Sequence, residues 1–156
     1  MPLLIVDKTA KNFDKKIEHT FSVKTLENIQ FEMITTYSSL VQQERLRGYS
    51  SIIGAVINYI NLHLTTPLTI DKLAAHVKRN PKYLSTIFKK EVGVGIKEYI
   101  NSARIRQSLP LLRNTDHVIS HIAMLVGFND ANYFTKVFVK EMGCTPTKYR
   151  ENNNII

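Results

Sequence analysis

Apolar residues recur at helical spacing along most of the chain. From Leu26 to Leu46 they follow one another every three or four positions, and the same period returns from Ser51 onward. This spacing places them on one face of a helix. A strand-like run is confined to Leu3–Val6, which is too short to build a sheet. The pattern therefore predicts an all-α protein.

Glycine, proline and polar capping residues divide this pattern into separate helices. Gly48 follows the first long segment, Ser51 is a candidate N-cap for the next helix, and Pro67 is expected to end that helix. Its apolar face would consist of Ile53, Val56, Ile57, Ile60 and Leu64. Shorter helices are predicted at 69–77, 81–90, 96–113, 119–126 and 130–142, with a last turn after Pro146. The short connections between them favour compact packing.

One segment of the chain occurs twice. Thr69–Val77 matches Val118–Val126 at a shift of 49 positions, and Tyr83–Gly93 matches Tyr133–Gly143 at a shift of 50. One residue is therefore inserted in the turn of the second copy. Each copy has the pattern of a short helix, a turn and a second helix that ends in glycine, which is typical of a helix-turn-helix.

Small residues and left-handed positions support this interpretation. Ala74 and Ala123 lie where the two helices of each copy must cross closely. Four residues later the first helix must end in a left-handed conformation, which suits Gly127 but costs ~1 kcal/mol at its counterpart Lys78. The predicted inward faces are Leu73, Val77, Leu84, Ile87 and Phe88 in the first copy, and Ile122, Val126, Phe134, Val137 and Phe138 in the second.

Positive charge is concentrated in the part of the chain that carries the repeat. Residues 51–156 hold fourteen Lys and Arg against seven Asp and Glu, whereas residues 1–50 hold seven against six. A basic excess of this kind suits nucleic acid, an acidic membrane or an acidic protein. No apolar run reaches the ~18 residues of a membrane span, and the single cysteine, Cys144, excludes an internal disulfide. We expect a cytoplasmic protein with no membrane attachment.

The repeat region resembles the DNA-binding domain of the AraC/XylS transcriptional regulators. The second copy carries the stronger match, at Ile119–Ala123, Val126–Phe128, Tyr133–Phe134, Phe138, Gly143, Thr145–Pro146 and Tyr149–Arg150. The first copy agrees at Leu73–Ala74, Tyr83–Ser85, Phe88–Glu91, Gly93, Tyr99–Ile100 and Arg104–Ile105. The resemblance covers about residues 51–150 and leaves residues 1–50 outside it.

This resemblance implies a seven-helix fold. Two helix-turn-helix units, at about 69–93 and 118–143, would be joined by a connecting helix from Ile96 to about Asn114. At ~1.5 Å per residue that helix spans about 28 Å. One turn of B-DNA is about 34 Å, so the two recognition helices of a single monomer can enter successive major grooves. Pro110 lies inside the connecting helix, so we predict a kink or an early end near Arg106.

The outward positions of the two recognition helices are the candidate DNA contacts. By resemblance, the base-reading positions of the first unit are Lys82, Ser85 and Thr86. The second unit offers Asn129, Asn132 and Lys136, where asparagine suits adenine and lysine suits guanine. Phosphate contacts are expected from Lys89, Lys90, Lys140 and Arg150. For each lysine the alternative is a solvated surface charge, and Asp130 is interpreted as a helix N-cap.

Other chemistry finds little support in the sequence. His117 and His121 have the spacing of metal ligands, but two ligands are fewer than a zinc site needs. Cys144 has no Cys-His-Asn grouping that would make it a nucleophile, so it is interpreted as a packing residue. Gly93 and Gly95 do not follow a strand, which argues against a phosphate-binding glycine loop. Four tyrosines fall at core spacings: Tyr83, Tyr99, Tyr133 and Tyr149. We expect no enzymatic activity, no cofactor and no metal.

The sequence therefore predicts a DNA-binding regulator of transcription. The resemblance implies a sequence-specific bacterial protein that binds double-stranded DNA, contacts RNA polymerase and more often activates than represses. The alternatives are a non-specific architectural DNA-binding protein and a helical protein–protein adaptor. Residues 1–50 would pack on the domain, dimerise or transmit a signal. The chain itself would be either a C-terminal fragment or a regulator with a reduced N-terminal part. The oligomeric state stays open, although a monomeric domain suffices for binding.

Overall fold

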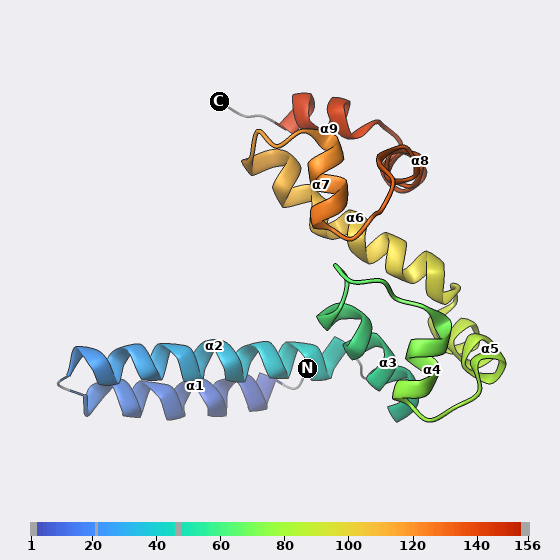
Figure 1. The fold of residues 1–156 in the computed structure, drawn as a ribbon. Helices are drawn as coiled ribbons and strands as arrows, with labels where there is room; N and C mark the ends of the chain where they lie inside the picture. Colours follow the sequence, from blue (N-terminus) through green and yellow to red (C-terminus); the bar gives the residue numbers. More distant parts are fainter. Residues whose placement is uncertain (1–2, 21, 46–47, 154–156) are drawn as a thin grey trace. The chain divides into compact units, whose positions relative to one another are not determined.

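The computed structural model describes residues 3–20, 22–45 and 48–153, and all regular structure in these ranges is helical. The all-α fold predicted from the sequence is therefore confirmed. Contacts along the chain divide it into two compact units, Met1–Gly48 and Tyr49–Ile156, which are described separately below. Figure 1 shows the helices of both units.

The first unit is a hairpin of two helices, α1 (Leu3–Glu18) and α2 (Val23–Arg45). Phe13 and Ile29 are its buried side chains among the described residues, and Lys16 binds Glu32 at 2.6 Å across the hairpin. The long helix predicted from Leu26 is confirmed as α2, although its predicted end at Leu46 lies outside the described residues. The strand-like run at Leu3–Val6 is instead the first turn of α1.

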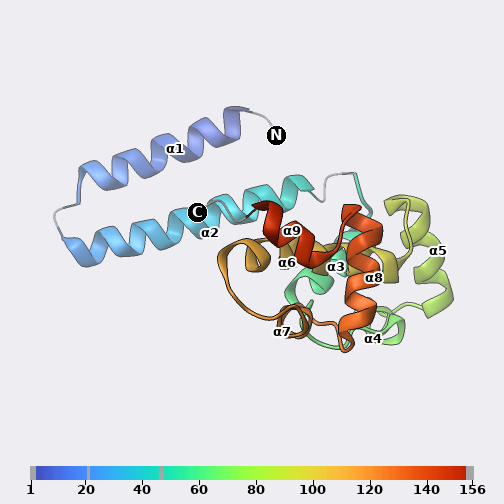
Figure 2. The same ribbon diagram turned by 90° about the horizontal axis from the view of Figure 1, so that it is seen from above.

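The second unit contains seven helices in its described residues, as the family resemblance implied: α3 (Ser51–Leu62), α4 (Ile70–His76), α5 (Pro81–Val92), α6 (Ile96–Asn114), α7 (Ile119–Leu125), α8 (Ala131–Met142) and α9 (Pro146–Asn153). Helix α6 connects two groups of shorter helices, α3 to α5 at its beginning and α7 to α9 toward its end (Figures 1 and 2). The connecting helix has the bounds that the sequence predicted.

Polar side chains fix where these helices begin. The Ser50 hydroxyl accepts a hydrogen bond from the N–H of Ile53 at 3.4 Å, so Ser50, and not the predicted Ser51, is the N-cap of α3. Asp130 caps α8 by accepting from the N–H of Tyr133 at 2.6 Å, as predicted. Helix α3 ends at Leu62, before Pro67, because the backbone already turns at 63–66 through a hydrogen bond from Thr66 to His63.

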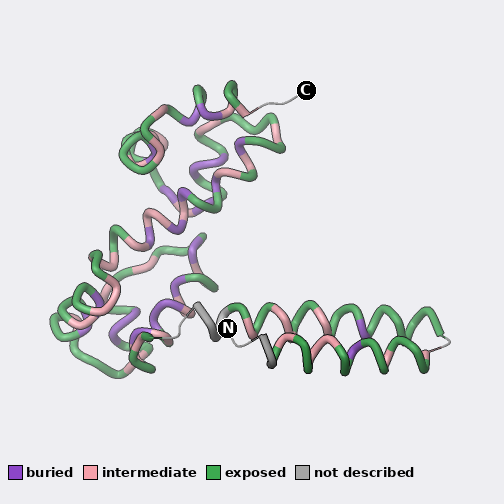
Figure 3. The backbone as a smooth tube through the Cα atoms, turned by 180° about the vertical axis from the view of Figure 1, so that it is seen from behind, coloured by how far each residue is buried: buried purple, intermediate pink, exposed green. Residues whose placement is uncertain are grey.

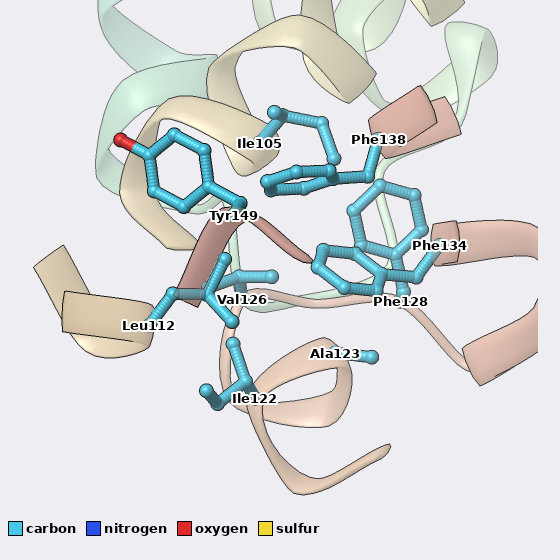
Figure 4. Close-up of a cluster of buried hydrophobic side chains, with 9 residues drawn as sticks. All are labelled: Ile105, Leu112, Ile122, Ala123, Val126, Phe128, Phe134, Phe138 and Tyr149. Atoms are coloured by element: carbon cyan, nitrogen blue, oxygen red, sulfur yellow. The ribbon is translucent and has the colours of Figure 1, made fainter. Parts of the chain in front are cut away.

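Each group of helices encloses an apolar core. The apolar face predicted for this helix is buried, including Leu64 just beyond the end of α3, together with Leu73, Ala74, Leu84 and Phe88. The second core consists of Ile105, Leu112, Ile122, Ala123, Val126, Phe128, Phe134, Phe138 and Tyr149, with Cys144 packed against it as expected (Figure 4). Val77, Ile87 and Val137, also predicted to point inward, are half-buried. Figure 3 shows the buried positions concentrated in this unit.

Helix α6 does not end near Arg106, contrary to the prediction from Pro110. It continues as one α-helix to Asn114 with Pro110 inside it. Proline removes the hydrogen bond to the Arg106 carbonyl, but Ile105 and Leu112 on either side are fully buried in the second core. Pro110 itself is exposed, so its ring lies on the solvent side of the helix. Burial of the opposite face therefore holds the helix together, and the predicted kink stays a prediction.

Replacing Pro110 by alanine should stabilise the second unit. Alanine restores the missing backbone hydrogen bond at an exposed position, so we expect the free energy of unfolding to rise by roughly 1–3 kcal/mol. Urea unfolding followed by circular dichroism measures this. Gln107→Ala, at an exposed position on the same helix, is the control and should change stability far less. A less stable Pro110→Ala variant would show that the core needs the geometry proline imposes.

Candidate nucleic-acid interface

The two helix pairs α4–α5 and α7–α8 are built on the same turn. Lys78 has φ 52° and Gly127 has φ 95°, so both occupy the left-handed conformation predicted for them. The next N–H in each turn bonds back to the alanine at the crossing, from Arg79 to Ala74 and from Phe128 to Ala123, at 2.9 Å in both. Both alanines are buried. The duplicated helix-turn-helix predicted from the repeat is therefore confirmed.

Helix α5 presents the predicted DNA-contacting residues of the first helix-turn-helix to solvent. Lys82, Ser85 and Thr86 are exposed, while Leu84 and Phe88 are fully buried on the opposite face. The helix begins sharply, because the Asn80 side chain accepts from the N–H of Lys82 at 2.8 Å and Pro81 occupies the first turn. The Lys82 side chain therefore starts from a fixed backbone at the exposed beginning of α5.

Helix α8 repeats this arrangement one copy later. Asn132 and Lys136 are exposed on it, and the intervening Thr135 is half-buried with its hydroxyl donated to the Ala131 carbonyl at 2.9 Å. Asn129 is also exposed but lies in the turn before the Asp130 cap, outside the helix. The structure thus brings Asn132 and Lys136 onto one helix and leaves Asn129 beside its start.

The two recognition helices lie at different ends of α6 and run in similar directions. In Figure 1 both α5 and α8 are seen nearly along their axes, and in Figure 2 both are seen from the side. Both belong to the compact unit Tyr49–Ile156. Their exposed faces are therefore carried by one scaffold.

The four candidate phosphate contacts have different surroundings. Lys89 and Lys90 are exposed in the last turn of α5. Lys140 forms an ion pair with Glu98 of α6 at 2.8 Å. Arg150 is half-buried and donates to the carbonyl oxygens of Leu112 at 3.3 Å and His117 at 2.5 Å. Arg150, which the sequence predicts as a phosphate contact, thus also holds α9 against the end of α6.

Two of the four tyrosines expected in the core are instead surface residues. Tyr83 is 48% exposed and Tyr133, its counterpart in the second copy, is 40% exposed. The Tyr133 hydroxyl accepts from the side-chain amide of Asn101 at 2.9 Å, and the Lys97 ammonium lies 5.5 Å from its ring centre. The repeat reveals that the two positions are equivalent, but repetition alone does not tell a buried residue from one at the edge of a face.

The other two tyrosines point inward as expected. Tyr149 is buried in the second core, and the ring of Tyr99 packs edge-on against Phe88 at 5.5 Å. His117 and His121 pack ring against ring at 4.7 Å. Within the described ranges no group of three or more His, Cys, Asp or Glu is placed to hold a metal ion. Nor is any described helix long and apolar enough to cross a bilayer.

Comparison with known proteins identifies the class and then the family. A helix-turn-helix domain model matches residues 73–152, a little over half of the chain. The C-terminal domain of AraT, a response regulator from Geobacillus stearothermophilus, matches with a TM-score of 0.65 at 31% identity, over 69% of this chain and 89% of that one. The chain is thus a helix-turn-helix protein. It belongs to the AraC family of regulators.

Two further proteins extend the comparison. The transcriptional activator RhaR of Mannheimia succiniciproducens is 30% identical over 111 residues, which are 70% of this chain and 40% of RhaR. The DNA-binding domain of AdpA, solved in complex with a target DNA, shares the fold with a TM-score of 0.62 at 21% identity, over 66% of this chain and 93% of that one. The chain spans less than half the length of the curated relatives it matches.

The ion pair between Lys140 and Glu98 predicts a measurable titration. The hydrogen bond and the charge of Lys140 hold the pKa of the Glu98 carboxyl below its ordinary value. The pair therefore stabilises the fold at pH values above the ordinary carboxyl pKa, and this contribution is lost as the pH falls through the lowered pKa. In Lys140→Ala we expect the pKa of Glu98 to rise toward 4.5, measured by NMR of the side-chain carboxyl.

Lys148→Ala is the matched control, because Lys148 is an exposed lysine on α9. It should leave the Glu98 titration unchanged. An equal shift in both variants would mean that the general positive charge of the domain, rather than the pair with Lys140, depresses the pKa.

Proposed function

We propose that this chain binds double-stranded DNA at specific sequences and regulates transcription from a nearby promoter in the bacterial cytoplasm. The observation that carries the proposal is the pair of exposed faces on α5 and α8. Each face has a lysine or asparagine at its start and a further polar residue one turn later. Because the two helices run in similar directions on one scaffold, one molecule can place both in successive major grooves.

In this proposal the residues divide into two groups by the part of DNA they touch. Bases are read by Lys82, Ser85 and Thr86 from α5 and by Asn132 and Lys136 from α8, with Asn129 at its entry. Phosphates are bound by Lys89 and Lys90, and by Lys140 once DNA competes with Glu98 for its ammonium. Arg150 stays in this group as well, and phosphate would compete there with its hydrogen bonds to the carbonyls of Leu112 and His117.

Activation of transcription, with contact to RNA polymerase, is part of the same proposal. Its support is the family to which the chain belongs and the description of RhaR as a transcriptional activator. The basic charge of residues 51–156 supports the polyanion partner but does not by itself require specificity. A preference for one sequence therefore has to be measured directly.

Selection of bound DNA from a random pool tests the proposal. We expect one enriched site with two halves about 10 base pairs apart, corresponding to one turn of the duplex, and a preference of ~10³ or more over unrelated DNA. Salt-sensitive binding without any enriched sequence would point to an architectural protein. Absence of salt-sensitive DNA binding would point to a protein–protein adaptor.

Substitution of the two exposed lysines should relax specificity in different halves of that site. We expect Lys82→Ala to lose discrimination at one or two base pairs of one half, and Lys136→Ala at one or two of the other, by roughly 1–3 kcal/mol each. Repeating the selection with each variant measures this. Lys148→Ala, on α9, serves as the charge-matched control. If Lys82→Ala and Lys136→Ala relaxed specificity at the same base pairs, the assignment would be contradicted.

A further inference from the structure

The two helix-turn-helix units are connected by more than the backbone of α6. Arg104, near the middle of α6, extends a half-buried guanidinium toward the end of α3. Its Nε donates to the Leu64 carbonyl at 2.9 Å and its Nη2 to the Thr66 carbonyl at 3.0 Å. Charged hydrogen bonds to backbone carbonyls are about twice as strong as neutral ones, so this arginine fixes the segment that leaves α3.

The same guanidinium contacts the second helix-turn-helix. Its central carbon lies 5.6 Å from the ring centre of Phe128, which follows Gly127 in the turn between α7 and α8. The Phe128 ring is buried and packs edge-on against Phe134 of α8 at 5.2 Å. Arg104 therefore joins the end of α3, which packs on α4 and α5, to the turn that positions α8. We call Leu64, Thr66, Arg104 and Phe128 the Arg104 bridge.

Gly127 shows how closely the second helix-turn-helix approaches the segment after α3 at this bridge. A Cβ atom at Gly127 would lie 2.3 Å from the Leu64 carbonyl oxygen and 2.9 Å from the Arg104 Nε. The backbone of the second turn is therefore pressed directly against the residue that ends the α3 segment. Partial burial also lowers the pKa of the Arg104 guanidinium below its ordinary value.

The first turn has no equivalent restriction. Lys78 adopts the same left-handed conformation as Gly127, yet its side chain is exposed. Arg79, the counterpart of Phe128, is exposed too. A left-handed lysine is thus tolerated in the first copy at a modest cost, whereas the second copy requires glycine because Leu64 occupies the space. The asymmetry between the two copies follows from the bridge.

We propose that Arg104 is a positioning residue that sets the angle and separation between α5 and α8. Helix α6 is the backbone connection between the two helix-turn-helix units, so any twist or bend along it would move one relative to the other. The Arg104 bridge restricts such movement, because it joins the segment after α3 and the turn between α7 and α8 to the same guanidinium. Its effect on DNA, which rests on the function proposed above, is to fix the number of base pairs between the two half-sites.

A distance measurement without DNA tests the bridge itself. Spin labels at Ser85 and Lys136, in a Cys144→Ala chain, report the separation of α5 and α8 by pulsed electron resonance. We expect one narrow distance distribution that broadens in Arg104→Ala and in Arg104→Gln, which keeps a side chain of similar length. Arg106→Ala is the matched control, because Arg106 is exposed and donates to Ser102 of the same helix at 2.9 Å. This variant should keep the narrow distribution.

Helix content by circular dichroism shows whether each variant is folded. If Arg104→Ala is unfolded, the distance distribution of Arg104→Gln tests the proposal instead. An unchanged distribution in a folded Arg104 variant overturns the proposal. This result does not depend on DNA, so it stands even if selection from a random pool yields no site and the proposed function fails.

The second measurement uses selected sites whose halves are moved together or apart by one base pair. The unsubstituted chain should bind the original spacing best. Arg104→Ala should lose about tenfold or more at that spacing, since the second contact is no longer held in place, while its affinity for an isolated half-site stays within about twofold. The same spacing preference in Arg104→Ala as in the unsubstituted chain would contradict a positioning role.

Discussion

The close crossing of two helices over a buried alanine is the constraint on which the second unit depends. Ala74 and Ala123 are buried where the helices of each pair pack, so a larger side chain there would have to displace its neighbours. Each crossing forces the first helix to end at once in a left-handed turn, and the turn directs the second helix outward. One small residue in each copy thereby determines which face of α5 and of α8 meets solvent.

Much of this fold follows from local signals in the sequence. Helical periodicity, the Asp130 cap and the left-handed positions at Lys78 and Gly127 were all predictable, since each depends on residues close together in the chain. The bounds of α6 were also predictable, but its continuity through Pro110 was not. That continuity depends on Ile105 and Leu112 being buried by helices far along the chain, and periodicity does not report how tightly they are held.

The candidate interface was predictable in its composition and less so in its surroundings. Lys82, Asn132 and Lys136 are exposed as expected because they lie opposite strongly apolar positions. The hydrogen bonds of Arg150 were not predictable, since a basic residue near a chain end has the same sequence signature whether it meets solvent or backbone carbonyls. The contacts of Arg104 were not predicted from the sequence either. Its partners Leu64 and Phe128 are separated from it by loops, and no short pattern connects them.

The residue inserted in the second turn has a further consequence. With Asn129 added before Asp130, α8 starts one position later relative to its turn than α5 does. The two copies are also joined head to tail in one chain, without the two-fold axis that relates the halves of a dimer. A nucleic acid bound by both would therefore meet two unlike surfaces in a set order. The two ends of such a footprint would differ, so a single molecule would distinguish the upstream from the downstream direction of its target.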